Sequence, residues 1–97
     1  MSQPFTVIAT IVAKAGHETA LEKSLRAILQ PTRAEAGCLS YELHQDRENN
    51  AAFYMLERWT DDAALEAHGN SAHIQAFRAE AGDLIEQFVL KRVQHLA

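Results

Sequence analysis

The sequence predicts an α+β fold, with one layer of strands covered by helices. Three observations lead to this prediction. Four short runs show strand patterns, two regions show helical periodicity, and they follow one another in the order β-α-β-β-α-β. The chain has 97 residues, so we expect residues 1–97 to form a single domain.

The first strand is predicted over Phe5–Val12, a short β-branched run. A helix is predicted over about His17–Ala36. Its apolar residues recur at helical spacing, at Leu21, Leu25, Ile28 and Leu29. Pro31 should kink this helix or end its regular part, because proline lacks an N–H and crowds the preceding turn. We expect Gly37 to close the element as a C-cap glycine.

The middle of the chain predicts a β-hairpin. Apolar and polar residues alternate over Leu39–Gln45, which is the period of a strand with one buried face. Residues 46–50 form a polar turn, and Ala52–Trp59 follows as the next strand. The loop between these strands has about five or six residues.

A second helical region follows the hairpin. Residues 60–62 supply an N-cap and two acidic side chains, which favour the positive end of a helix. Residues 69–71 interrupt this short helix after His68, and Asn70 or Ser71 can cap the next one. The apolar residues of that helix are Ile74, Phe77, Ala81 and Leu84.

The last strand is predicted over Phe88–Val93. The complete order is that of a ferredoxin-like sandwich, a four-stranded antiparallel sheet with both helical regions on one face. Two strands carry apolar residues on both sides, however. Ile8 and Leu56 point away from the side on which Val7 and Met55 lie. We therefore expect a second subunit to cover the open sheet face, and the alternative is scattered surface exposure.

Composition excludes several classes of protein. The net charge of −4 disfavours a nucleic-acid-binding module. No apolar run approaches the roughly 18 residues that span a bilayer, and the first residues lack a secretory signal pattern. Cys38 is the one cysteine, which excludes an internal disulfide and a multi-thiolate metal site. We expect a cytoplasmic protein without nucleic-acid or membrane partners.

Several residues could form a small-molecule pocket. Glu57 and Trp59 point to the same side of their strand, and with Met55 and His68 they would line an apolar pocket with a few ionisable groups. The alternative is that Trp59 and His68 are ordinary core residues. His68 and His73 are five residues apart and do not share a helix face, so no metal site is expected.

The acidic residues are spread over helices and turns and are interpreted as solvated faces. They are Glu18, Glu22, Glu35, Glu48, Glu66 and Glu80.

Three segments resemble the antibiotic biosynthesis monooxygenase family, specifically its small single-domain quinol monooxygenases. They are residues 33–43, 53–59 and 68–77. The resemblance covers essentially the whole chain and implies a dimeric α+β barrel, in which two sheets pair face to face. It also implies oxidation of a quinol or dihydroxy-aromatic by O₂ without metal, flavin or haem. A base, a dry aromatic slot and donors for the developing charge would suffice for this chemistry.

The resemblance also suggests roles for individual residues. His68 matches the family's helix histidine and is the candidate base, with His73 as a second proton-transfer candidate. Trp59, Phe77 and Met55 would form the slot. Tyr41 and Glu57 would hold the substrate hydroxyls or orient the imidazole.

Other activities stay open. Haem-degrading relatives use an Asn on the first strand, which Phe5–Val12 lacks. Relatives that isomerise small phosphorylated signalling sugars need a phosphate clamp, and the arginines are scattered in the sequence. A third alternative is a non-catalytic dimer that binds a small aromatic and serves in sensing or stress response.

Overall fold

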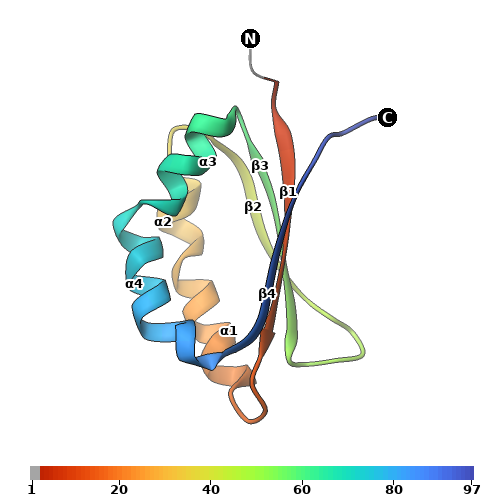
Figure 1. Cartoon of the computed structure of the whole chain (residues 1–97), viewed down its shortest axis with the longest axis vertical. Helices are drawn as coiled ribbons and strands as arrows, with labels where there is room; N and C mark the ends of the chain where they lie inside the picture. Colours follow the sequence, from red (N-terminus) through yellow and green to blue (C-terminus); the bar gives the residue numbers. More distant parts are fainter. Residues whose placement is uncertain (1–2) are drawn as a thin grey trace.

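The computed structural model describes residues 3–97, and Met1 and Ser2 lie outside the described residues. Its sheet contains β1 (Phe5–Ala13), β2 (Cys38–Gln45), β3 (Ala52–Trp59) and β4 (Ile85–Val93). The strands lie in the order β2-β3-β1-β4, and all neighbouring pairs are antiparallel. The helices lie on one face of this sheet (Figure 1). The predicted ferredoxin-like α+β fold is confirmed.

Four α-helices and one short 3₁₀ helix occur in the described residues. They are α1 (Glu18–Ala27), α2 (Leu29–Arg33), α3 (Asp62–Gly69), α4 (Ala72–Ala81) and η1 (Gly82–Leu84). Asp61 caps α3 by accepting a hydrogen bond from the Ala64 N–H, and Ser71 caps α4 by accepting one from the Ile74 N–H. At the predicted break after His68, α3 ends at Gly69 and α4 begins at Ala72 with its own N-cap.

The first helical region differs in detail from the expected single helix over 17–36. The helix breaks at Ile28, between α1 and α2, and α2 ends at Arg33. Pro31 explains the position of the break, because a proline removes the hydrogen bond to the carbonyl four residues earlier and crowds it. That carbonyl belongs to Ala27, the last residue of α1.

The prediction that Gly37 is a helix C-cap is wrong, because α2 has already ended and Ala34 is its C-cap. Gly37 is needed for a different reason. A Cβ at this position would overlap the Cβ of Ala64 in α3 and lie 3.0 Å from the Thr60 Oγ1. The absent side chain therefore lets α3 pack directly against the segment that leads into β2.

The last strand starts at Ile85, three residues before the predicted start at Phe88, and its pairing with β1 shifts between Val12 and Ala13. The residues of β1 and β3 point to the two faces of the sheet as predicted. Val7, Met55 and Trp59 are buried under the helices, whereas Ile8 and Leu56 are exposed on the other face. No helix among residues 3–97 is long and apolar enough to cross a membrane.

Candidate active site

A cavity of about 700 Å³ lies between the sheet and the helices. Its inner wall includes Tyr41 on β2, Met55 and Glu57 on β3, and His68 on α3. These residues meet because alternate positions of neighbouring strands face the helices, and Tyr41 is paired directly with Glu57 across β2 and β3. The cavity thus brings together Met55, Glu57 and His68 of the expected pocket and adds Tyr41, whereas Trp59 does not line it.

The outer part of the cavity is lined by both apolar and basic side chains. Phe77 of α4 and Phe88 and Leu90 of β4 contribute the apolar surface. Phe88 is 56% exposed, so the cavity opens to solvent along β4. Arg78 and Arg92 also line it, but the Arg78 guanidinium donates to the Gly69 carbonyl and the Arg92 guanidinium pairs with Asp62 at 3.2 Å.

Trp59 lies behind the cavity wall and is fully buried. Its indole Nε1–H donates a 2.9 Å hydrogen bond to Glu57 Oε1, so the two residues are linked along the same face of β3. The Trp59 ring also packs at centroid distances of 4.7 Å from His68 and 6.4 Å from Tyr41. Trp59 therefore contacts Glu57, His68 and Tyr41 from the side away from the cavity.

Burial changes the acid–base properties of two wall residues. Loss of hydration raises the pKa of Glu57 to about 7, although the hydrogen bond from Trp59 opposes this increase. Burial also raises the pKa of Tyr41, and the nearby Glu57 carboxylate adds to this effect. The wall therefore offers a phenol that stays protonated and a carboxyl group that changes charge near neutral pH.

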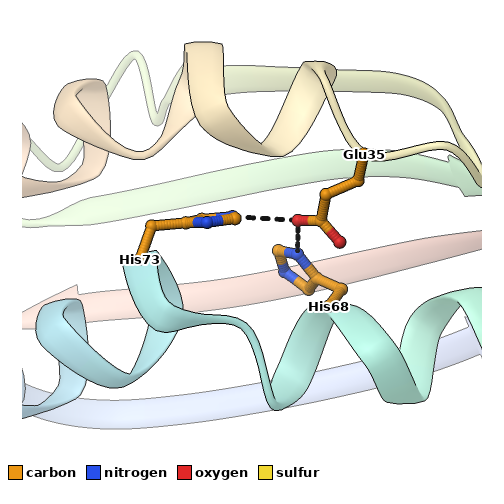
Figure 2. Close-up of side chains that lie close together, drawn as sticks. All are labelled: Glu35, His68 and His73. Carbon is orange, nitrogen blue, oxygen red and sulfur yellow. Dashed lines mark hydrogen bonds and ion pairs between the residues drawn. The ribbon is translucent and has the colours of Figure 1, made fainter.

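A carboxylate joins the two histidines of the site (Figure 2). Glu35 Oε2 lies 2.8 Å from His68 Nδ1 and 2.9 Å from His73 Nε2. Glu35 follows α2, His68 is in the last turn of α3, and His73 is in the first turn of α4. Ser71 supports this junction, because its hydroxyl donates to the His68 carbonyl at 2.7 Å.

His68 is a buried imidazole that lines the cavity. Burial lowers its pKa, and the contact with Glu35 opposes this decrease, so the neutral form is favoured at pH 7. Within the described residues 3–97, the His68 ring makes its hydrogen bond through Nδ1, to Glu35. Its other nitrogen, Nε2, points away from Glu35 (Figure 2). His73 does not line the cavity but contacts the same carboxylate from the outside.

The sequence did not predict the position of Glu35. It was expected on a solvated face, but its side chain is 17% exposed and contacts both histidines. Glu35 is 33 positions from His68 and 38 positions from His73 in the sequence, and contacts over such separations leave no local pattern. The three side chains also place one ligand atom each within 4.8 Å of one another, an arrangement that can hold a metal ion.

The cysteine of the chain does not join this site as a reactive group. Burial raises the pKa of the Cys38 thiol, and the carboxylates of Glu35 and Glu57 add to the increase. A nucleophilic thiolate requires the opposite environment.

Comparison with known proteins agrees with this fold. The protein PA3566 from Pseudomonas aeruginosa has a solved structure that superimposes with a TM-score of 0.95, at 50% identity, over 100% of this chain and 98% of that one. The solved structure of Rv0793 from Mycobacterium tuberculosis gives a TM-score of 0.90 at 31% identity, over 98% of this chain and 97% of that one.

Sequence comparison finds two relatives that are both named as monooxygenases. "Putative monooxygenase Rv0793" is 35% identical over 85 residues, which cover 88% of this chain and 83% of the relative. "Putative monooxygenase YcnE" from Bacillus subtilis is 37% identical over 60 residues, which cover 62% of this chain and 63% of the relative. The family model described as Antibiotic biosynthesis monooxygenase matches residues 4–80. This chain belongs to the antibiotic biosynthesis monooxygenase family.

Proposed function

We propose that this protein oxidises a quinol or another dihydroxy-aromatic with O₂ and uses no metal, flavin or haem. The observation that carries the proposal is the buried imidazole of His68, which lines an apolar cavity together with Tyr41 and Glu57 and whose Nδ1 is hydrogen-bonded to Glu35. A neutral imidazole at this position can accept a phenolic proton. The family membership and the names of the relatives support the same reaction type.

The reaction begins with removal of a proton from a substrate hydroxyl. His68 Nε2 takes this proton, and the resulting phenolate is electron-rich enough to transfer an electron to O₂. Over the whole reaction, one oxygen atom replaces a ring hydrogen and the other leaves as water, while the quinol becomes a hydroxyquinone. The quinol supplies all the electrons, so no separate reductant is needed.

The surrounding side chains would bind and orient the substrate. Met55 and Phe77 supply apolar contacts for the ring, and Trp59 supports that slot from behind. The Tyr41 hydroxyl can donate a hydrogen bond to a substrate oxygen, since the phenol stays protonated. Glu57 can accept a hydrogen bond or a proton from a second hydroxyl, because its pKa lies near 7.

We also propose that the protein acts as a homodimer through the open face of the sheet. Ile8 and Leu56 are paired across β1 and β3 and are exposed on that face, and Val93 is exposed at the end of β4. Pairing of two such faces would remove apolar surface from water and leave the helix-side cavity of each subunit intact.

The decisive experiment measures oxygen uptake by chelator-treated protein across a panel of hydroquinones with increasing ring number. We expect uptake above the spontaneous rate, and a kcat about 100-fold lower or more for His68→Ala. His95→Ala is the matched control, because this exposed histidine lies beyond β4 and away from the cavity. Uptake equal to spontaneous oxidation for every quinol would refute the proposed activity.

Oxygen uptake and two optical measurements together separate the other functions. A phospho-sugar isomerase would convert its substrate without consuming oxygen. A binding protein would change the fluorescence of Trp59 when an aromatic is added but would release no product. The absorption spectrum of the purified protein checks for bound haem or flavin.

A further inference from the structure

We propose that Glu35 is a positioning residue that holds His68 in the tautomer needed for catalysis, and that His73 keeps Glu35 in place. This inference rests on the proposed function for its catalytic part. Its structural part, the control of the His68 tautomer, can be measured without any turnover. The sequence and the comparisons assign no role to Glu35.

The hydrogen bonds define which ring nitrogen carries the proton. A carboxylate can only accept, so His68 Nδ1, at 2.8 Å from Glu35 Oε2, must donate its N–H. A neutral imidazole has one N–H, which leaves a free lone pair on Nε2. Nε2 is the nitrogen that points away from Glu35, and His68 lines the cavity. The carboxylate thus prepares the ring to accept a proton from a bound ligand.

His73 contributes by holding the carboxylate. Its Nε2 lies 2.9 Å from the same Glu35 oxygen, so it donates the second hydrogen bond to that atom. The exposed fraction of the side chain is 10% for His68, 17% for Glu35 and 22% for His73. His73 therefore closes the site on its outer side, and it is not among the residues that line the cavity.

The carboxylate also stabilises the charged form of His68 that proton transfer creates. After Nε2 accepts the substrate proton, the Nδ1–H of the imidazolium faces an ionised oxygen at hydrogen-bond distance. The rings of Tyr41 and His73 pack against this ring, the Arg78 charge acts on it, and Glu57 lines the same cavity. Glu35 makes the shortest contact to Nδ1, so its removal should have the largest effect on the ring.

The first experiment is nuclear magnetic resonance of the histidine rings in ¹⁵N-labelled protein without ligand. We expect the Nδ1–H tautomer for His68 in the wild type. In Glu35→Gln the amide can donate to Nδ1, so the population should shift toward Nε2–H. Glu80→Gln, at an exposed position on α4, is the matched control and should leave the tautomer unchanged. An Nε2–H ring in the wild type, or no change in Glu35→Gln, would overturn the proposal.

The second experiment measures the kinetics of the same variants. We expect kcat to fall about 10- to 100-fold in Glu35→Gln while KM changes by less than about 2-fold, since the base is misdirected but the cavity is unchanged. The acidic limb of the pH profile should move to lower pH, because the carboxylate that favours protonated His68 is gone. Wild-type kcat in Glu35→Gln would overturn the catalytic role.

A second variant keeps the test valid if Glu35→Gln fails to fold. His73→Gln removes a more exposed ring that holds Glu35, so the Nδ1–H population of His68 should decrease and kcat should fall by about 3- to 10-fold. Unchanged kcat in this variant would overturn the role of His73. If the wild type oxidises no quinol but Glu35→Gln still shifts the tautomer, the proposed function fails and the positioning by Glu35 stands.

Discussion

Glu57 is a carboxyl group in an unusual environment. It is 4% exposed, and the indole of Trp59 donates a hydrogen bond to it. Burial raises its pKa from the ordinary value of 4.5 to about 7. The folded protein therefore retains this proton over a pH range in which the unfolded chain releases it. Folding stability must decrease as the pH rises through that range.

Replacement of Glu57 by Gln should remove this pH dependence. In the wild type the loss of folding stability that comes from ionising buried Glu57 is absent below pH 4.5, grows between pH 4.5 and 7, and is complete above pH 7. A difference of this size corresponds to about 3 kcal/mol. We expect Glu57→Gln to gain about 2–3 kcal/mol relative to the wild type on going from pH 5 to pH 8. Urea unfolding at the two pH values measures it.

Gln preserves the size of the side chain and an oxygen that can accept the Trp59 N–H. Glu80→Gln on the exposed face of α4 is the control for general charge effects. Equal pH dependence in the wild type and in Glu57→Gln would show that Glu57 does not titrate near neutral pH in the folded protein.

The sequence predicted those site positions that follow from strand parity. Met55, Glu57 and Trp59 share a face because alternate residues of a strand do, and Tyr41 joins them by pairing with Glu57. Glu35 could not be predicted in this way. The position of Glu35 depends on how α2, α3 and α4 pack together. The residues around His68 in the sequence do not indicate that Glu35 will contact it.

The sequence pattern predicted a break in the first helical region near Pro31, but not the residue at which the helix breaks. The effect appears at Ile28, because proline acts on the carbonyl one turn earlier. The early end of α2 at Arg33 then frees Glu35 from the helix and lets it reach α3.

The position of α3 depends on the absent side chain of Gly37. We expect Gly37→Ala to destabilise the protein by about 1–3 kcal/mol, because its Cβ would overlap that of Ala64. Since α3 carries His68, displacement of this helix should also weaken the contact with Glu35. Chemical denaturation measures the stability, and the ring shifts of His68 report the displacement.

A double variant tests whether the overlap is the cause. Ala64→Gly removes the Cβ that Gly37→Ala would meet, so the double variant should lose less stability than the sum of the two single changes. Gly82→Ala is the control, because a Cβ there has open space and the backbone φ is −54°. Additive losses in the double variant would refute contact between these two positions as the reason for Gly37.

The sheet has one face packed by helices and one that remains open (Figure 1). The open face carries Ile8, Leu56 and Val93 as exposed apolar side chains, whereas Val7, Ala9 and Met55 are buried on the other. The alternation within β1 and β3 predicted this difference. The sequence pattern does not identify the partner that covers the open sheet face, because apolar surface alone does not specify what covers it.

The proposed homodimer predicts that one charge on the open face will separate the subunits. Leu56 is paired with Ile8 near the middle of that face, and in a symmetric dimer each substitution occurs twice. We therefore expect Leu56→Lys to be a folded monomer at a micromolar concentration at which the wild type is a dimer, as measured by sedimentation velocity. Ala79→Lys on the exposed side of α4 should remain dimeric. A monomeric wild type would exclude the dimer. A dimeric Leu56→Lys would instead place the interface elsewhere, since two buried and unpaired ammonium groups are too costly to retain.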